Sequence, residues 1–278
     1  MQGLIPYLAV ALFYAGLGVY FWRRTWHVGS HGGTAVHQAA AHWMRGLAIL
    51  PPLAGHGLLL HSSIFSPFGL DFGLGNTVSA LAWLTVATYW LVNLRYRMEA
   101  MLAMALPIAA VSVLLPALFP STHLLSHASL PLFKLHLAIS LLAYSLLAIA
   151  ALHALLMSLV ERRLHEKTLL ATFVGLPPLL TMERLLFQII TVGFVLLTLT
   201  LASGILFSEE LFGKPLQFNH KTIFGIVSWA AFAGLLIGRH VYGWRGRTAI
   251  RWTLAGFALL LLGYLGSKFV LEIVLSRP

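Results

Sequence analysis

The stretch LFKLHLAISLLAYSLLAIAALHALLMSL, residues 132–159, decides the fold class of this chain. It contains a single charged side chain, Lys134, close to its first residue. About 20 mostly apolar residues are enough for an α-helix to cross the hydrocarbon core of a bilayer. An apolar run of this length therefore predicts a membrane-spanning helix rather than a buried helix of a soluble domain.

Further apolar windows of spanning length lie on both sides of it, at roughly 3–22, 45–63, 74–94, 100–119, 185–207, 221–242 and 250–274. We expect the first window to be a retained helix and not a cleavable signal peptide, because it lacks a basic segment before it and Arg23 and Arg24 follow it. The sequence thus predicts an all-α, polytopic membrane helix bundle with about eight transmembrane helices. We expect a single integral-membrane domain over residues 1–278.

The composition supports this class of protein and excludes several others. Of the 278 residues, 59% are hydrophobic and only 9% are charged, and the mean hydropathy is +0.86. Soluble domains carry about 25% charged residues, so a soluble enzyme, a disordered protein and a nucleic-acid-binding domain are excluded. The net charge of +10 reports orientation in a membrane, not binding to nucleic acid. The chain has no Cys, which excludes disulfides, Fe–S clusters and covalently attached haem.

The basic residues predict the orientation of the helices. If the amino terminus lies outside, the inner connections carry most of the Lys and Arg residues. The outer side keeps only Lys134, Lys214, Lys221, Lys268 and Arg277. Because basic residues concentrate on the cytoplasmic side, we expect both termini outside, in the periplasm of a bacterial inner membrane.

The positions of the acidic residues limit the classes of function that the protein can have. None of them falls in the middle of a predicted span, and transporters driven by protons or cations usually need a buried carboxylate. The sequence also contains no GxSxG, HExxH or P-loop motif. We therefore predict no catalytic residue.

Histidines are the metal-binding side chains that remain at membrane depth. His136 lies near the predicted outer end of the 132–159 window, the fifth along the chain. His220 lies at the outer end of the 221–242 window, the seventh, and His240 lies at its inner end. His56 lies between the two levels, on the second window. Two facing imidazoles can bind haem iron in a six-coordinate site. A histidine at a helix end is otherwise an interfacial residue, and spacing alone does not show which of these helices touch.

The remaining histidines have simpler interpretations. We expect His153, deep in the fifth window, to make a packing hydrogen bond, and His123 and His127 to be solvated loop residues. Four histidines of the first inner loop have irregular spacing and no Cys or acidic companion, which argues against a metal site: His27, His31, His37 and His42.

Three segments resemble a known family of membrane proteins. Residues 134–145, KLHLAISLLAYS, are similar to the histidine-containing helix of the CcsA/CcmC-type cytochrome c assembly family. Residues 238–246, GRHVYGWRG, resemble the segment after that family's tryptophan-rich loop. The segment MERLLF at 182–187 is similar to the YpjD branch of the family, which is related to the HemX-like proteins. The resemblance is firm over 132–270 and weaker over 1–130.

The resemblance implies a function in which haem is handled inside the membrane. Better-studied members bring haem to the outer face and present it for attachment to apocytochrome c. His136 then matches an outer-face haem ligand, and His240 matches the membrane-embedded histidine after the tryptophan-rich loop. His220 and His56 match histidines of the YpjD branch. The implied cofactor is non-covalent haem b, and the implied partners are haem, the lipid bilayer and cytochrome c assembly proteins or another membrane protein.

The sequence departs from the family pattern at the outer face. The loop at 208–220, SEELFGKPLQFNH, stands where the tryptophan-rich motif should be and contains no Trp. The second outer histidine of the family falls near Val274 and Leu275, so it is missing. Our hypothesis is that His220 replaces the missing ligand.

Two other functions stay open at this point. One is a haem-free accessory or interaction subunit of a membrane transporter or assembly complex, which would purify colourless. The other is a permease for a small solute or metal ion, which would need a polar path through the bundle.

Overall fold

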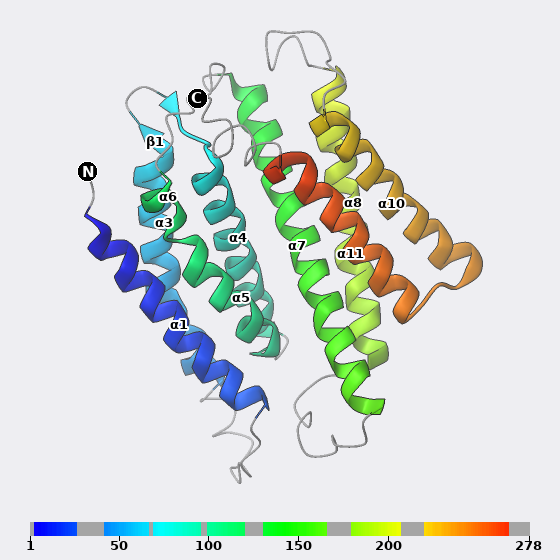
Figure 1. Ribbon diagram of the computed structural model, residues 1–278, viewed down its shortest axis with the longest axis horizontal. Coiled ribbons are helices and arrows are strands. Elements are labelled where there is room, and N and C mark those ends of the chain that lie inside the picture. Colours follow the sequence, from blue (N-terminus) through cyan, green and yellow to red (C-terminus); the bar gives the residue numbers. More distant parts are fainter. Residues whose placement is uncertain are drawn as a thin grey trace.

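The computed structural model describes residues 3–26, 42–66, 69–95, 99–119, 130–165, 179–206 and 220–266. Over these residues the chain forms long helices and one small hairpin, arranged as two side-by-side groups of helices (Figure 1). In a bilayer core each backbone amide and carbonyl must be bonded inside the protein, and helices meet this need within each segment.

The amino-terminal half, the left group in Figure 1, consists of α1 (Leu4–Trp26), α3 (Leu50–Ile64), α4 (Leu74–Arg95), α5 (Glu99–Ser112) and α6 (Leu115–Leu118). A helical turn at 42–47 precedes α3, and two prolines occupy the first positions of α3, where no helical partner for their nitrogen is needed. The antiparallel strands β1 (Phe65–Ser66) and β2 (Gly69–Leu70) connect α3 to α4. α1 packs on α5 and α3, and α4 packs on α5 and α3.

The carboxy-terminal half consists of α7 (Pro131–His165), α8 (Leu179–Leu206), α10 (His220–Tyr242), α11 (Arg247–Leu261) and the π-helical turn η1 (Leu262–Gly266). α7 packs along α8 and α11, while α10 packs on α11, α8 and η1. α7 also contacts α4 and α5, so it is the helix that joins the two halves.

The predicted all-α, polytopic class is confirmed. Among the described residues, seven helices are long and apolar enough to cross a membrane, including Pro131–Arg162, which contains the whole 132–159 stretch. The eighth predicted window begins as α11, which has 15 residues and passes into η1 at Leu262, too short to count as an uninterrupted α-helical span. Residues 267–274 of that window lie outside the described residues.

Consecutive spanning helices run in alternate directions, and α1 begins toward the same end of the bundle as η1 ends (Figure 1). This end is called the outer end below, after the orientation that the basic residues predict. The opposite end, where α5 and α8 begin, is called the inner end. Which of the two faces the periplasm remains a prediction.

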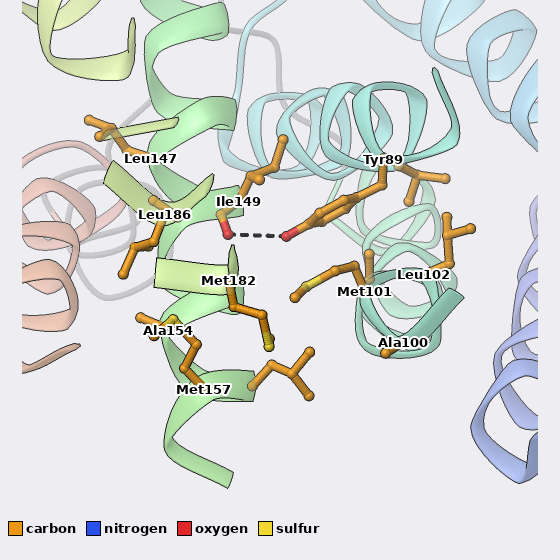
Figure 2. Packing of buried hydrophobic residues seen from close by; sticks show 14 of the residues in the cluster. Tyr89, Ala100, Met101, Leu102, Leu147, Ile149, Ala154, Met157, Met182 and Leu186 are labelled. Carbon is orange, nitrogen blue, oxygen red and sulfur yellow. Dashed lines mark hydrogen bonds between the residues drawn. The ribbon is translucent and has the colours of Figure 1, made fainter. Parts of the chain in front are cut away.

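The two halves meet through a core of small and flexible side chains. Figure 2 shows Tyr89 of α4 reaching across to α7, where its hydroxyl donates a hydrogen bond of 3.0 Å to the carbonyl oxygen of Ile149. Around it lie buried side chains of α5, α7 and α8, among them Ala100, Met101, Ala154, Met157 and Met182. Alanines allow helices to approach closely in a membrane, and methionines fill the gaps that remain.

Glycines of α10 allow close packing. A Cβ on Gly225 would lie 3.4 Å from Leu201, and one on Gly234 would lie 3.3 Å from Trp252. Gly238 lies directly against the indole of Trp244, so any side chain there would displace the ring.

Candidate functional site

His136 lies in the second turn of α7 at the outer end and is half-buried against α8. Its Nδ1 is 2.8 Å from Ser203 Oγ. Ser203 Oγ has one hydrogen and donates it to the carbonyl oxygen of Thr200, 3.1 Å away. If the hydroxyl keeps that bond, the imidazole donates in the first one, which puts the proton on Nδ1 and the lone pair on Nε2 when His136 is neutral.

Four elements converge around this histidine. A Cβ on Gly204 of α8 would lie 3.5 Å from His136 Cε1, so the helix backbone comes close to the ring. Lys221 of α10 is near enough for its charge to act on His136, and its Nζ lies 4.5 Å from the centre of the Tyr264 ring in η1. Tyr264 in turn packs edge to face on Tyr144 of α7, at 5.8 Å between ring centres. The outer end of the carboxy-terminal half thus gathers imidazole, hydroxyl, ammonium and aromatic groups.

His220 is exposed and is the first residue of α10. α10 begins at the outer end, where α7 also begins (Figure 1). Both helices pack on α8. α7 contacts it where His136 meets Ser203, and α10 contacts it where Gly225 meets Leu201. The structure therefore brings His136 and His220 to the same end of the same half.

His56 and His240 are not brought together. His56 is fully buried on α3, where its Nε2 is 2.8 Å from Ser79 Oγ of α4. His240 is exposed in the last turn of α10 at the inner end. α3 and α10 lie at opposite sides of the molecule, with α4, α7 and α8 between them in Figure 1.

Two other histidines make structural hydrogen bonds. His153 Nε2 donates to the carbonyl oxygen of Met182 at 2.9 Å, which is the packing role that its depth predicts. His42 Nε2 donates to the carbonyl oxygen of Asn93 at 2.8 Å. The other three histidines of the first inner loop, as well as His123 and His127, lie outside the described residues. Within the described ranges, no three His, Cys, Asp or Glu side chains gather in a way that could bind a metal ion.

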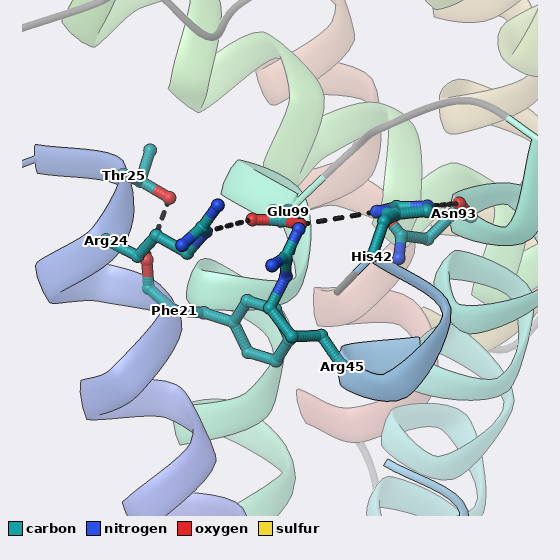
Figure 3. A network of polar contacts seen from close by, with 7 residues as sticks. All are labelled: Phe21, Arg24, Thr25, His42, Arg45, Asn93 and Glu99. Atoms are coloured by element: carbon teal, nitrogen blue, oxygen red, sulfur yellow. Dashed lines mark hydrogen bonds and ion pairs between the residues drawn. The ribbon is translucent and has the colours of Figure 1, made fainter. Parts of the chain in front are cut away.

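Glu99, which opens α5 at the inner end, has a role that was not predicted from the sequence. Its carboxylate oxygens lie 3.0 Å from Arg24 Nε and 2.8 Å from Arg45 Nη2, and Oε1 is 3.3 Å from His42 Nδ1 (Figure 3). The carboxylate thus connects α1, the 42–47 turn and α5. We call Glu99 with Arg24, Arg45 and His42 the Glu99 cluster.

A second carboxylate acts at the inner end of the other half. Glu183, in the second turn of α8, lies 2.8 Å from Arg239 Nη1 and 3.6 Å from Arg245 Nε. Its Oε2 also accepts a hydrogen bond of 3.3 Å from the amide of Gly246. Gly246 has φ +52°, a conformation that glycine adopts without strain. We call Glu183 with Arg239, Arg245 and Gly246 the Glu183 cluster. The position of Glu183 near the inner end of its helix, with arginines near the inner ends of other helices, is the sequence pattern that could have indicated this cluster.

The fold and these sites define a multi-pass, all-helical membrane protein with a histidine-bearing outer end and carboxylate–arginine clusters at its inner end. The chain matches the cytochrome c assembly protein family over residues 52–275 and belongs to that family, in its YpjD-like branch. It is a protein of the bacterial inner membrane.

Curated relatives support this membership. The chain is 31% identical over 224 residues to inner membrane protein YpjD of Escherichia coli, covering 80% of this chain and 84% of that protein. It is 32% identical over 210 residues to an uncharacterized 28.8 kDa protein of Azospirillum brasilense, covering 75% and 77%. Cytochrome c biogenesis protein CcsA of Prochlorococcus marinus is 35% identical over 89 residues, covering 32% of this chain and 28% of CcsA. No solved structure matches the chain.

Proposed function

We propose that this protein binds haem b non-covalently at its outer end, between His136 and His220, and moves or presents it as cargo. Membership of the family supports a role in cytochrome c biogenesis. Beyond that role, we propose that the cargo is haem, that it is of the b type, and that His136 and His220 are its ligands. Cytochrome c assembly proteins are the partners that would receive or supply the haem.

The contact between His136 and Ser203 carries the proposal. In the tautomer with the proton on Nδ1, Ser203 Oγ accepts from the ring, holds its orientation and leaves the lone pair on Nε2 for iron. Histidines that bind a metal through one nitrogen usually donate the other N–H to a nearby acceptor, which raises the basicity of the ligand. The half-buried position gives the ligand apolar surroundings while keeping it near the membrane surface.

His220 suits the role of second ligand because it is exposed at the same end. Cargo must be released, and a ligand in the first turn of a helix can let go of iron without disturbing packed core residues. The Glu183 and Glu99 clusters lie at the opposite end and are not part of this site. We do not extend the proposal to His240 and His56, because they lie in different halves.

Absorption spectra test the proposal. The protein is purified in mild detergent with and without added haem, and spectra are recorded oxidised and dithionite-reduced. The bound form should show the sharp α and β bands of six-coordinate haem b, which His136→Ala and His220→Ala should each abolish. His61→Ala is the matched control, since His61 is also exposed toward the outer end but stacks on Phe65 in the other half. Its spectrum should be unchanged.

A pair of serine variants tests the role of Ser203. Ser203→Ala removes the acceptor for His136 Nδ1 and should weaken haem affinity by about 10-fold or more, the usual effect of losing such a partner. Ser140→Ala removes only a hydroxyl that bonds the His136 carbonyl oxygen one turn back, and should leave affinity unchanged. Equal effects of the two variants would argue against a ligand role for His136.

The spectrum also decides between this function and its main rival. A protein that stays colourless after haem addition, and whose His136→Ala variant still supports cytochrome c maturation in cells, would be an accessory subunit that keeps the fold without haem. Loss of maturation in His136→Ala together with loss of the spectrum would support haem handling.

A further inference from the structure

A polar cluster unrelated to the outer end lies inside the amino-terminal half. It consists of Tyr14 on α1, His56 on α3 and Ser79 on α4, which are 0%, 0% and 1% exposed. The rings of Tyr14 and His56 pack edge to face at 5.7 Å between centres, and His56 Nε2 is 2.8 Å from Ser79 Oγ. The cluster therefore joins three helices through polar side chains.

The cluster lies at an apolar depth. His56 is eight residues from the last residue of α3 and Tyr14 is ten residues from the first residue of α1, or about 12 and 15 Å from those helix ends at 1.5 Å per residue. Polar side chains at such a depth are costly unless every donor and acceptor is bonded.

Two polar atoms of this cluster have no hydrogen-bond partner among the described residues. They are the Tyr14 hydroxyl and His56 Nδ1, which belong to rings that touch each other. Buried polar atoms without a protein partner are usually bonded to ordered water, which makes about three hydrogen bonds in such places. Because the two unbonded atoms belong to rings in contact, one shared ligand explains both better than two unrelated unbonded groups would.

We propose that Tyr14 and His56 bind a water molecule within the bundle of α1, α3 and α4. Water fits both tautomers of the imidazole. If the Ser79 hydroxyl donates to Nε2, Nδ1 has the proton and donates to the water; if Nε2 donates to Ser79, Nδ1 has a lone pair and accepts from the water. In either case it can bond the Tyr14 hydroxyl as well. The site extends the Ser79–His56 hydrogen bond to α1, so the water is part of the packing of this half.

His153 provides the contrast that makes the inference specific. Its Nδ1 is also buried without a partner in the described part of the chain, but its Nε2 donates to a backbone carbonyl, which leaves only a lone pair on Nδ1. No second orphaned side chain stands beside it within the described ranges. A single acceptor among apolar groups does not make a water site.

The sign of a stability change tests the proposal. If water bonds the Tyr14 hydroxyl, Tyr14→Phe breaks that bond and should lower the unfolding temperature by about 3 °C in lipid nanodiscs. If the hydroxyl is truly unbonded, its removal relieves a desolvated group and the unfolding temperature should rise, which would overturn the proposal. Tyr89→Phe is the matched control, because its hydroxyl has a defined partner in Ile149 and its loss must destabilise.

Solid-state NMR of the haem-free protein with ¹⁵N-labelled histidine gives a second, independent readout. We expect magnetisation transfer from water to His56 and none to His153, and the His56 transfer should be lost in Tyr14→Phe. Absence of transfer to His56 would overturn the proposal. So would a His56 signal that moves when haem is added, since Nδ1 would then be an iron ligand. Neither result depends on whether His136 binds haem.

Discussion

The two halves of the molecule are alike at the inner end and different in their interior. Each has one largely buried glutamate, Glu99 or Glu183, near the start of a helix, bonded to two arginines from neighbouring segments. Deeper in, each half has a buried histidine whose Nδ1 has no partner among the described residues, but His153 bonds a backbone carbonyl, whereas His56 bonds a side chain and packs on Tyr14, whose hydroxyl is also unpartnered there. The inner ends therefore serve packing in both halves, while the interior polar groups differ in what they can bind.

The two carboxylate clusters also differ in how deeply their arginines are buried. Arg45 is 14% exposed in the Glu99 cluster, whereas Arg245 is 64% exposed in the Glu183 cluster. An exposed arginine returns to water when it loses its partner, but a buried one is left with an uncompensated charge. The similarity between the halves should therefore break when each carboxylate is removed in turn.

The largest effect is expected for Glu99→Gln. The change leaves the Arg45 and Arg24 charges without a counterion in a largely buried place and should lower the free energy of unfolding by about 3 kcal/mol. Denaturation followed by tryptophan fluorescence in mixed micelles measures it. A loss no larger than that of an exposed ion pair would show that the cluster contributes little to stability.

Glu183→Gln should have a smaller effect, about 2 kcal/mol, because only Arg239 keeps a mostly buried charge and the amide can still accept from Gly246. The same denaturation assay compares the two variants directly. If Glu183→Gln destabilises the protein as much as Glu99→Gln, arginine exposure does not explain the difference between the clusters.

Tyr89→Phe tests the connection between the halves rather than either half. It leaves the Ile149 carbonyl without the hydroxyl donor from α4 and should cost about 1 kcal/mol. Limited proteolysis of the α5–α7 connection should also become faster, because the halves are held together less firmly. An unchanged cleavage rate and stability would indicate that apolar packing around Met101 and Met182 suffices.

The smallest effect is expected for Glu161→Gln. Its partner Arg247 is 65% exposed, and the pair joins α7 to α11 at the inner surface with a distance of 2.7 Å. Exposed ion pairs contribute little, so the loss should be below about 0.5 kcal/mol at 0.15 M salt. A larger loss would place this pair with the two clusters and extend the comparison to a third site.

Much of the fold could be predicted from the lengths of the apolar segments alone. The 132–159 stretch and the other windows determined an all-α membrane bundle, because a bilayer sets the length of a spanning segment and forbids unbonded backbone. The packing role of His153 could also be foreseen. The end of regular α-helix at Leu261 could not, because the change to a π turn depends on how η1 packs against α10.

The candidate site shows the same division. The sequence alone determined which histidines lie near the same end of the bundle, since depth follows from position along a helix of fixed rise. Only the tertiary structure decided that α7 and α10 share α8, that Ser203 lies against His136 Nδ1, and that His56 and His240 lie apart. The physical reason is that hydropathy specifies how far a residue lies from the water, while side-chain packing between helices decides what lies beside it.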